Sequence, residues 1–210
     1  MKKAEKKIRT PVQSRSKEKK DRIILVAYDL FNEEGYSAVS IRKIAKAAGV
    51  SIGTIYSYFQ DKRDIYIATA VLYSHDMYTN FSSAIQDKKV SAENIEEVLY
   101  TIIIKFKEII QSHYNFHLDS VVLSLTDDKI REALAVQEHE VANSVSTLFV
   151  QLLGDKIEVQ DEEIATFIIR KAIEEIVQHI LFYKVDLPEE LVFRELALMI
   201  SRYIEKKSPS

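Results

Sequence analysis

Few side chains in this 210-residue sequence have the type and spacing that metal binding or catalysis needs. His113 and His117 are four residues apart, a spacing that places two imidazoles on one helical face, where they could share a metal ion. The segment 113–115, however, is typical of a junction between helices, and a junction would not keep the two rings on one face. We therefore predict no metal site here.

Catalytic chemistry is not indicated elsewhere in the sequence. Cysteine is absent, which excludes a thiolate nucleophile, a disulfide framework and a cysteine zinc site. No nucleophile is paired with a base, and the four glycines do not form a Gly-rich phosphate loop. We predict that the protein is not an enzyme and that it has no catalytic residues, no metal and no cofactor.

Chemistry of another kind is indicated between residues 39 and 62. An apolar residue, a serine and a second apolar residue four positions after the serine occur in this order twice, in 39–44 and in 50–55. This order is typical of a capping serine and a hydrophobic staple at the start of a helix. Gly49 separates the two. The sequence therefore predicts two short helices joined by a tight turn, a helix-turn-helix whose second helix can enter the major groove of DNA.

The second of these helices has an inward and an outward side. Ile55 and Phe59 are four residues apart and are expected to face inward, so residues 52, 54 and 57 face outward, and the tyrosines at 56 and 58 can reach flanking phosphates. Gly53 has no side chain, which allows the backbone to approach DNA or the first helix. The alternative is that the two tyrosines are ordinary core aromatics.

The charge is distributed unevenly along the chain. Residues 1–66 contain 15 Lys and Arg against 8 Asp and Glu, whereas residues 67–210 contain 14 against 24. Because the phosphate backbone attracts basic side chains whatever the base sequence, nucleic acid is expected at the basic end and not at the acidic remainder. Residues 1–16 could also be only a flexible solubilising tail.

The elements that must position these residues are all helical. Glycine and proline are scarce, and apolar residues recur at helical spacing through most of the chain. We predict an all-α protein, in which an N-terminal three-helix domain is joined by a continuous helix to a larger C-terminal helical domain. The predicted ranges are 1–16 for a basic flexible arm, 17–65 for the helix-turn-helix domain and 66–210 for the larger helical domain.

The last two predicted helices, 161–183 and 188–206, are apolar on more than one face. A surface helix of a monomer needs only one apolar stripe, so a second stripe indicates a partner subunit. The alternative is that both helices are central in a monomeric bundle. The residues predicted at a homodimer interface are Ile169, Ile173, Ile176, Ile180, Val192, Leu196, Met199 and Tyr203.

Residues 22–66 resemble the DNA-binding region of the TetR family. The resemblance rests on the Leu30-Phe31 pair, on Gly35-Tyr36, on Ala48-Gly49-Val50-Ser51 and on Tyr58-Phe59, together with Ile44-Ala45, Gly53-Thr54, Tyr56 and Lys62. It implies that Thr54, Tyr56, Tyr58 and Lys62 anchor the DNA backbone and that positions 52 and 57 vary with the operator. Position 52 often carries a basic or polar residue in the family, whereas here it is Ile52. An isoleucine cannot hydrogen-bond to a base, so the remaining direct contact is an apolar one with a thymine methyl.

With the resemblance included, the predicted DNA-contacting residues are Ser40, Arg42, Ser51, Ile52, Gly53, Thr54, Tyr56, Ser57, Tyr58 and Lys62. The resemblance also implies a pocket for a small apolar effector in the C-terminal domain, for which the aromatic residues Tyr100, Phe106 and Tyr183 are the candidate walls.

The sequence predicts a cytoplasmic protein without a membrane partner, because it has no apolar stretch of about 18 residues and no signal peptide. The leading hypothesis is a transcription regulator, most simply a repressor, that binds a near-palindromic operator as a dimer and is released by its effector. The alternative is a DNA-binding regulator or architectural factor that is controlled by a protein partner, with no small ligand.

Overall fold

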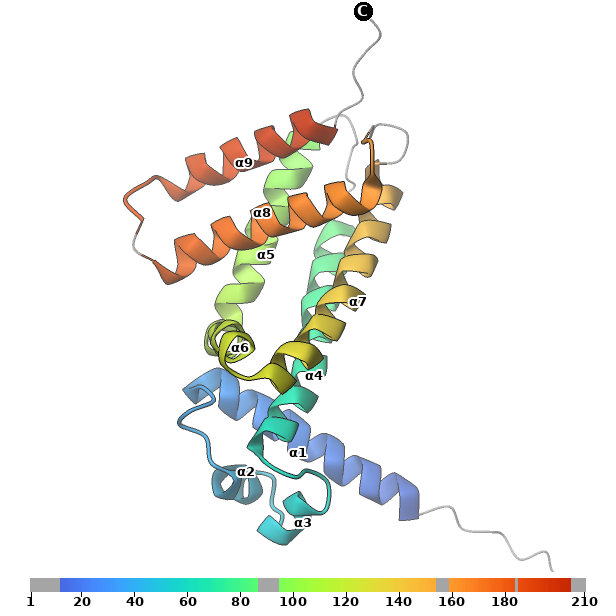
Figure 1. The fold of residues 1–210 in the computed structure, drawn as a ribbon, viewed down its shortest axis with the longest axis vertical. Coiled ribbons are helices and arrows are strands. Elements are labelled where there is room, and N and C mark those ends of the chain that lie inside the picture. Colours follow the sequence, from blue (N-terminus) through green and yellow to red (C-terminus); the bar gives the residue numbers. More distant parts are fainter. Residues whose placement is uncertain (1–11, 87–94, 154–158, 184, 205–210) are drawn as a thin grey trace, which may run out of the picture. The chain divides into compact units, whose positions relative to one another are not determined.

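The computed structural model describes residues 12–86, 95–153, 159–183 and 185–204. In these ranges the regular secondary structure consists of helices, which turns and loops connect. The predicted all-α class is confirmed (Figure 1). The elements are α1 (Val12–Glu34), α2 (Ile41–Ala47), α3 (Ile52–Tyr56), α4 (Lys62–Gln86), α5 (Ile95–Ser112), α6 (Tyr114–Thr126), α7 (Asp128–Leu153), α8 (Glu162–Phe182) and α9 (Glu189–Ile204).

Contacts divide the chain into two units, one up to Leu72 and one from Tyr73 onward. The division falls inside α4, which is one continuous helix from Lys62. The N-terminal helix differs from our expectation, because α1 begins at Val12 and not at residue 17. The expected flexible arm is therefore corrected over residues 12–16, which are helical, and its residues 1–11 lie outside the described ranges.

The first unit is held together by an apolar core that includes an aromatic cluster. Phe31 of α1 and Tyr66 of α4 are buried, and their ring centroids lie 5.4 Å apart. Tyr36 packs against both rings, at 5.6 and 5.1 Å. Gly35 ends α1 with a φ of 81°, a left-handed conformation that glycine adopts without strain. The chain can therefore turn sharply toward α2.

The second unit is built around α5. This helix is buried on two sides because α9 packs along it and α8 packs against it as well (Figure 1). The core contains Ile103 and Ile110 of α5, Val177 of α8, and Phe193 and Ile200 of α9, all of which are almost fully buried. Helices α6 and α7 pack against each other in the same unit.

This packing corrects part of the predicted dimer interface. Ile169, Ile173 and Leu196 are buried in the core of their own protomer. The residues Ile176, Ile180 and Val192 are partly buried and pack against that core. The stripe that we assigned to a partner is therefore covered mostly by the chain itself, because α5 lies against α8 and α9.

Other apolar residues of α8 and α9 are exposed instead. We call them the exposed apolar residues of α8 and α9, and they are Ile164, Phe167, Ile168, Leu191, Met199 and Tyr203. Of the residues that we predicted at the interface, Met199 and Tyr203 are in this group. None of the described helices is long and apolar enough to cross a membrane.

Candidate nucleic-acid interface

The two predicted serine caps are present at the starts of α2 and α3. The backbone N–H of Lys43 donates to the Ser40 hydroxyl at 3.2 Å, and that of Thr54 donates to the Ser51 hydroxyl at 3.1 Å. Between the helices, Gly49 has a φ of 63°, which a residue with a side chain rarely adopts. The sequence therefore determines a short turn that fixes α3 relative to α2.

Helix α3 has the predicted inward and outward sides. Ile55 is fully buried and Phe59, just after the helix, is nearly so. On the other side Ile52 is 40% exposed, Tyr56 is 56% exposed and Ser57 is exposed. Tyr56 is thus not a core aromatic. The apolar side chain of Ile52, the aromatic side chain of Tyr56 and the hydroxyl of Ser57 are exposed together at one short helix.

Two of the other predicted DNA-contacting residues have partners within the protein. Thr54 is half-buried, and its hydroxyl lies 2.9 Å from the Ser51 hydroxyl, so both take part in the cap of α3. Tyr58 is also half-buried, and its hydroxyl lies 3.0 Å from that of Ser16 on α1. These contacts orient the two side chains before any DNA is bound.

Lys62 requires a correction. Its ammonium group is partly buried and donates to the backbone carbonyls of Tyr36 and Val39, at 2.8 and 3.0 Å. It also lies 4.0 Å from the centroid of the Tyr36 ring, within the range of a cation–π interaction. These interactions leave little of the ammonium for a phosphate. The residue therefore fixes the turn between α1 and α2, and we no longer assign it to the DNA backbone.

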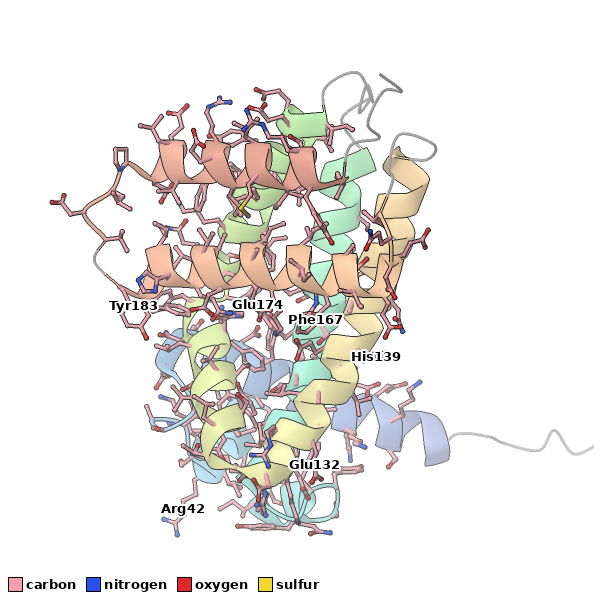
Figure 2. The ribbon with its side chains drawn as sticks, turned by 45° about the horizontal axis from the view of Figure 1, so that its top comes forward. Arg42, Glu132, His139, Phe167, Glu174 and Tyr183 are labelled. Carbon is pink, nitrogen blue, oxygen red and sulfur yellow. The ribbon has the colours of Figure 1, made fainter. Side chains whose placement is uncertain are left out.

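The exposed positive charge of α2 comes from Arg42, Lys43 and Lys46. The Lys43 ammonium forms an ion pair with Glu34 of α1, which reduces the charge available to a ligand. Arg42 extends away from the helix (Figure 2). Its guanidinium group has the exposure that a phosphate contact would need.

The three aromatic residues predicted to line an effector pocket differ in their surroundings. Tyr100 and Phe106 are half-buried against the core of the second unit, and the Arg194 guanidinium lies 4.3 Å from the centroid of the Tyr100 ring. Tyr183, at one end of α8 (Figure 2), is exposed and lines an open hollow of about 530 Å³ with Phe182, Leu187 and others. Tyr100 and Phe106 are not in the lining of this hollow.

Sequence reasoning missed a polar pair in the same unit. The Tyr73 hydroxyl of α4 and the Nδ1 atom of His117 on α6 are hydrogen-bonded, and both side chains are buried. Burial, and to a smaller extent the neighbouring His113, lowers the pKa of His117 to about 4. The histidine spacing was visible in the sequence, but the partner is 44 residues away and only the packing of α4 against α6 reveals it.

A family model described as bacterial regulatory proteins of the TetR family matches residues 23–69. A helix-turn-helix-type transcriptional regulator of Staphylococcus aureus (strain USA300) is 33% identical over 94 residues, which are 44% of this chain and 49% of that protein. The chain thus spans about half the length of the curated relatives that it matches.

Solved structures share the fold over most of the chain. A TetR-family transcriptional regulator from Streptomyces coelicolor has a TM-score of 0.70 at 18% identity, covering 89% of this chain and 80% of that one. The regulator FadR from Bacillus subtilis, in complex with stearoyl-CoA, has a TM-score of 0.62 at 24% identity, covering 88% and 99%. Residues 23–69, which carry both serine caps and the outward face of α3, are thus the part of the chain that is similar to the TetR family of bacterial regulatory proteins.

Proposed function

We propose that this chain is a transcription regulator whose first unit binds double-stranded operator DNA. The observation that carries this proposal is the outward face of α3, where Ile52, Tyr56 and Ser57 are exposed beside two rigid serine caps. A short helix presented in this way fits the major groove, and its first residues can reach base edges. The match of residues 23–69 to a family of bacterial regulators supports the same assignment.

Within this interface we assign two kinds of contact. Arg42 and Tyr56 contact phosphates, and Tyr58 supports them from its position against α1. Ile52 and Ser57 face base edges, Ile52 through an apolar contact with a thymine methyl. Phosphate contacts fix the register on the duplex, whereas base contacts determine the sequence that is preferred.

The regulator acts as a homodimer in this proposal. The exposed apolar residues of α8 and α9 support it, since Phe167 and Met199 are 57% and 55% exposed in the isolated chain. A dimer with two-fold symmetry presents two copies of α3, so the operator should be near-palindromic with half-sites about 34 Å apart.

Control by a small apolar effector is the remaining part of the proposal. One structural neighbour, FadR of Bacillus subtilis, is in complex with stearoyl-CoA, and the second unit of this chain has an open, partly apolar hollow at the end of α8. If effector binding weakens operator binding, the effector releases the regulator from the operator and repression ends. Operator binding must then weaken effector binding by the same factor.

Selection of duplexes from a random pool tests this function directly. We expect the full chain to recover a sequence with two-fold symmetry. Replacing Ile52 or Ser57 by Ala should change the preferred base at one symmetric pair of positions by about 1 to 3 kcal/mol. Recovery of no preferred sequence, or of one that both substitutions leave unaltered, would contradict the assignment. If the chain binds a symmetric operator and no small ligand releases the chain from it, control by a protein partner would be favoured.

A further inference from the structure

The second unit contains a buried polar atom that the fold does not satisfy. His117 is only 7% exposed, and its Nδ1 atom is occupied by the Tyr73 hydroxyl. Its other ring nitrogen, Nε2, is buried without a hydrogen-bond partner. Leaving such a group unpaired in the protein interior is unfavourable, so it requires an explanation.

The surroundings of this imidazole are aromatic. The Tyr73 ring packs beside it with a centroid distance of 5.9 Å, and Phe116 packs against Tyr73 at 5.0 Å. Phe182 is the last residue of α8, and its ring centroid is 5.9 Å from that of His117. Tyr114 contacts the same Phe182 ring edge-on at 5.3 Å. A flat aromatic molecule is the kind of ligand that such rings accept.

Phe182 connects this cluster to the open hollow at the end of α8. The same side chain that lies against His117 also lines the hollow, together with Tyr183, Val185 and Leu187. The volume of about 530 Å³ is within the range of small-molecule sites in proteins. Phe182 therefore lies both against His117 and in the lining of the hollow.

We propose that the hollow and His117 are two parts of one ligand site, which takes a small, uncharged aromatic compound bearing a hydroxyl or carbonyl group that hydrogen-bonds to Nε2. The site deepens the effector control proposed above and names the class of its ligand. Phe182 is the side chain that must move to admit it.

The ligand is uncharged for two reasons. Burial keeps the pKa of His117 near 4, so the imidazole is neutral at neutral pH and offers an anion no countercharge. Glu189, in the lining of the hollow, is acidic and already forms an ion pair with Lys107. A carboxylate would therefore be desolvated without compensation.

The site also has a route to the DNA-binding unit. Tyr73 bonds to His117 from α4, and α4 is one continuous helix that begins at Lys62 in the first unit. A ligand on Nε2 fixes the tautomer of the ring and so decides whether Nδ1 donates to or accepts from the Tyr73 hydroxyl. Tyr73 is thus the positioning residue through which occupancy acts on α4.

Binding of three matched probes to the full chain tests the ligand class. We expect 2-naphthol to bind about tenfold more tightly than naphthalene, because it completes the missing hydrogen bond. The anion 2-naphthoate should bind more weakly than both. Equal affinities for 2-naphthol and naphthalene, or no saturable binding of 2-naphthol up to about 1 mM, would overturn the proposal.

Variants and spectroscopy locate the bound probe. His117→Phe should reduce the affinity for 2-naphthol to that for naphthalene. His139→Phe is the matched control, because it makes the same change at an exposed histidine of α7 outside the proposed site, and it should leave both affinities unchanged. In the wild-type chain, saturating 2-naphthol should shift the ¹⁵N resonance of His117 Nε2. An unmoved resonance would place the probe elsewhere and overturn the site without depending on the folding of any variant.

The regulatory part rests on the proposed function and is measured separately. If 2-naphthol weakens binding of the selected operator, Tyr73→Phe should reduce that effect while changing the affinity for 2-naphthol by less than about threefold. Operator release that is unaltered by Tyr73→Phe would overturn the route through α4. Failure of the chain to bind any duplex would refute the proposed function, whereas the ligand site is decided by the probe affinities and the ¹⁵N shift alone.

Discussion

At the scale of single residues, the position of an ammonium group decides what it can do. Lys62 directs its charge onto the carbonyls of Tyr36 and Val39, whereas Arg42 extends from α2 without such a constraint (Figure 2). Both are basic residues of the same unit, and their types alone do not separate a structural role from a phosphate contact.

The different roles predict different consequences of substitution. Lys62→Ala removes a donor to two carbonyls and should lower the free energy of unfolding by about 1 to 3 kcal/mol, measured by urea denaturation. It should leave the slope of log operator affinity against log salt unchanged. Arg42→Ala is the control, since it should leave stability nearly unaltered and reduce the slope by nearly 2 per dimer. A Lys62→Ala variant of full stability with a reduced slope would restore our first assignment.

The buried His117 predicts a pH dependence of stability. Its pKa is about 4 in the folded protein, against an ordinary value of 6.5 that applies to the unfolded chain. Between these values the unfolded state binds a proton that the folded state does not, so stability falls as the pH falls through this window. The loss between pH 7 and pH 5 should be about 2 kcal/mol.

Urea denaturation at both pH values measures this loss. The His117→Phe variant should lack the part of the stability loss that His117 causes. His113, whose pKa is also lowered by burial, contributes to the stability loss in both proteins. An equal pH dependence in wild type and variant would show that the imidazole is not buried as described.

At the scale of elements, α2 and α3 are too short to be stable alone, and their caps and packing hold them. Ser40→Ala and Ser51→Ala should each lower the free energy of unfolding by about 1 kcal/mol, because a backbone N–H loses its acceptor. Ser37→Ala, in the exposed turn before α2, is the matched control and should have little effect. Thermal denaturation followed by circular dichroism measures the difference, and an equal effect at all three serines would argue against the caps.

The helices α8 and α9 show what periodicity can and cannot indicate. Their second apolar stripe was visible in the sequence, but the exposure of residues 164 and 167 was not predicted. The spacing does not tell which stripe a neighbouring helix of the same chain covers. Only the position of α5 assigns one stripe to the core and leaves the other exposed.

At the scale of the whole molecule, the exposed apolar residues of α8 and α9 predict self-association. Phe167→Glu combined with Met199→Glu should convert the dimer to monomers at micromolar concentration, because a buried charge without a partner opposes association. Sedimentation measures the state. Leu125→Glu, which places the same charge on an exposed apolar residue of α6, is the control and should leave the dimer intact. A wild-type chain that sediments as a monomer would refute the prediction.

The sequence by itself determined the elements and the DNA-binding motif. Capping serines, staples, glycine stops and helical spacing are local features, so they indicated α2, α3 and the inward side of α3 without knowledge of the fold. The family resemblance of residues 22–66 rests on the same local pattern, and the family match to residues 23–69 confirms it.

Tertiary structure alone decided how distant residues are paired. The carbonyls that hold Lys62 are 23 and 26 residues away, and the hydroxyl that bonds to His117 is 44 residues away. The covering of Ile169 and Leu196 likewise depends on α5. Such pairings follow from how helices pack, and a helix with two apolar stripes can pack in more than one way. Composition and periodicity therefore leave the pairing open, and burial in the folded chain selects it.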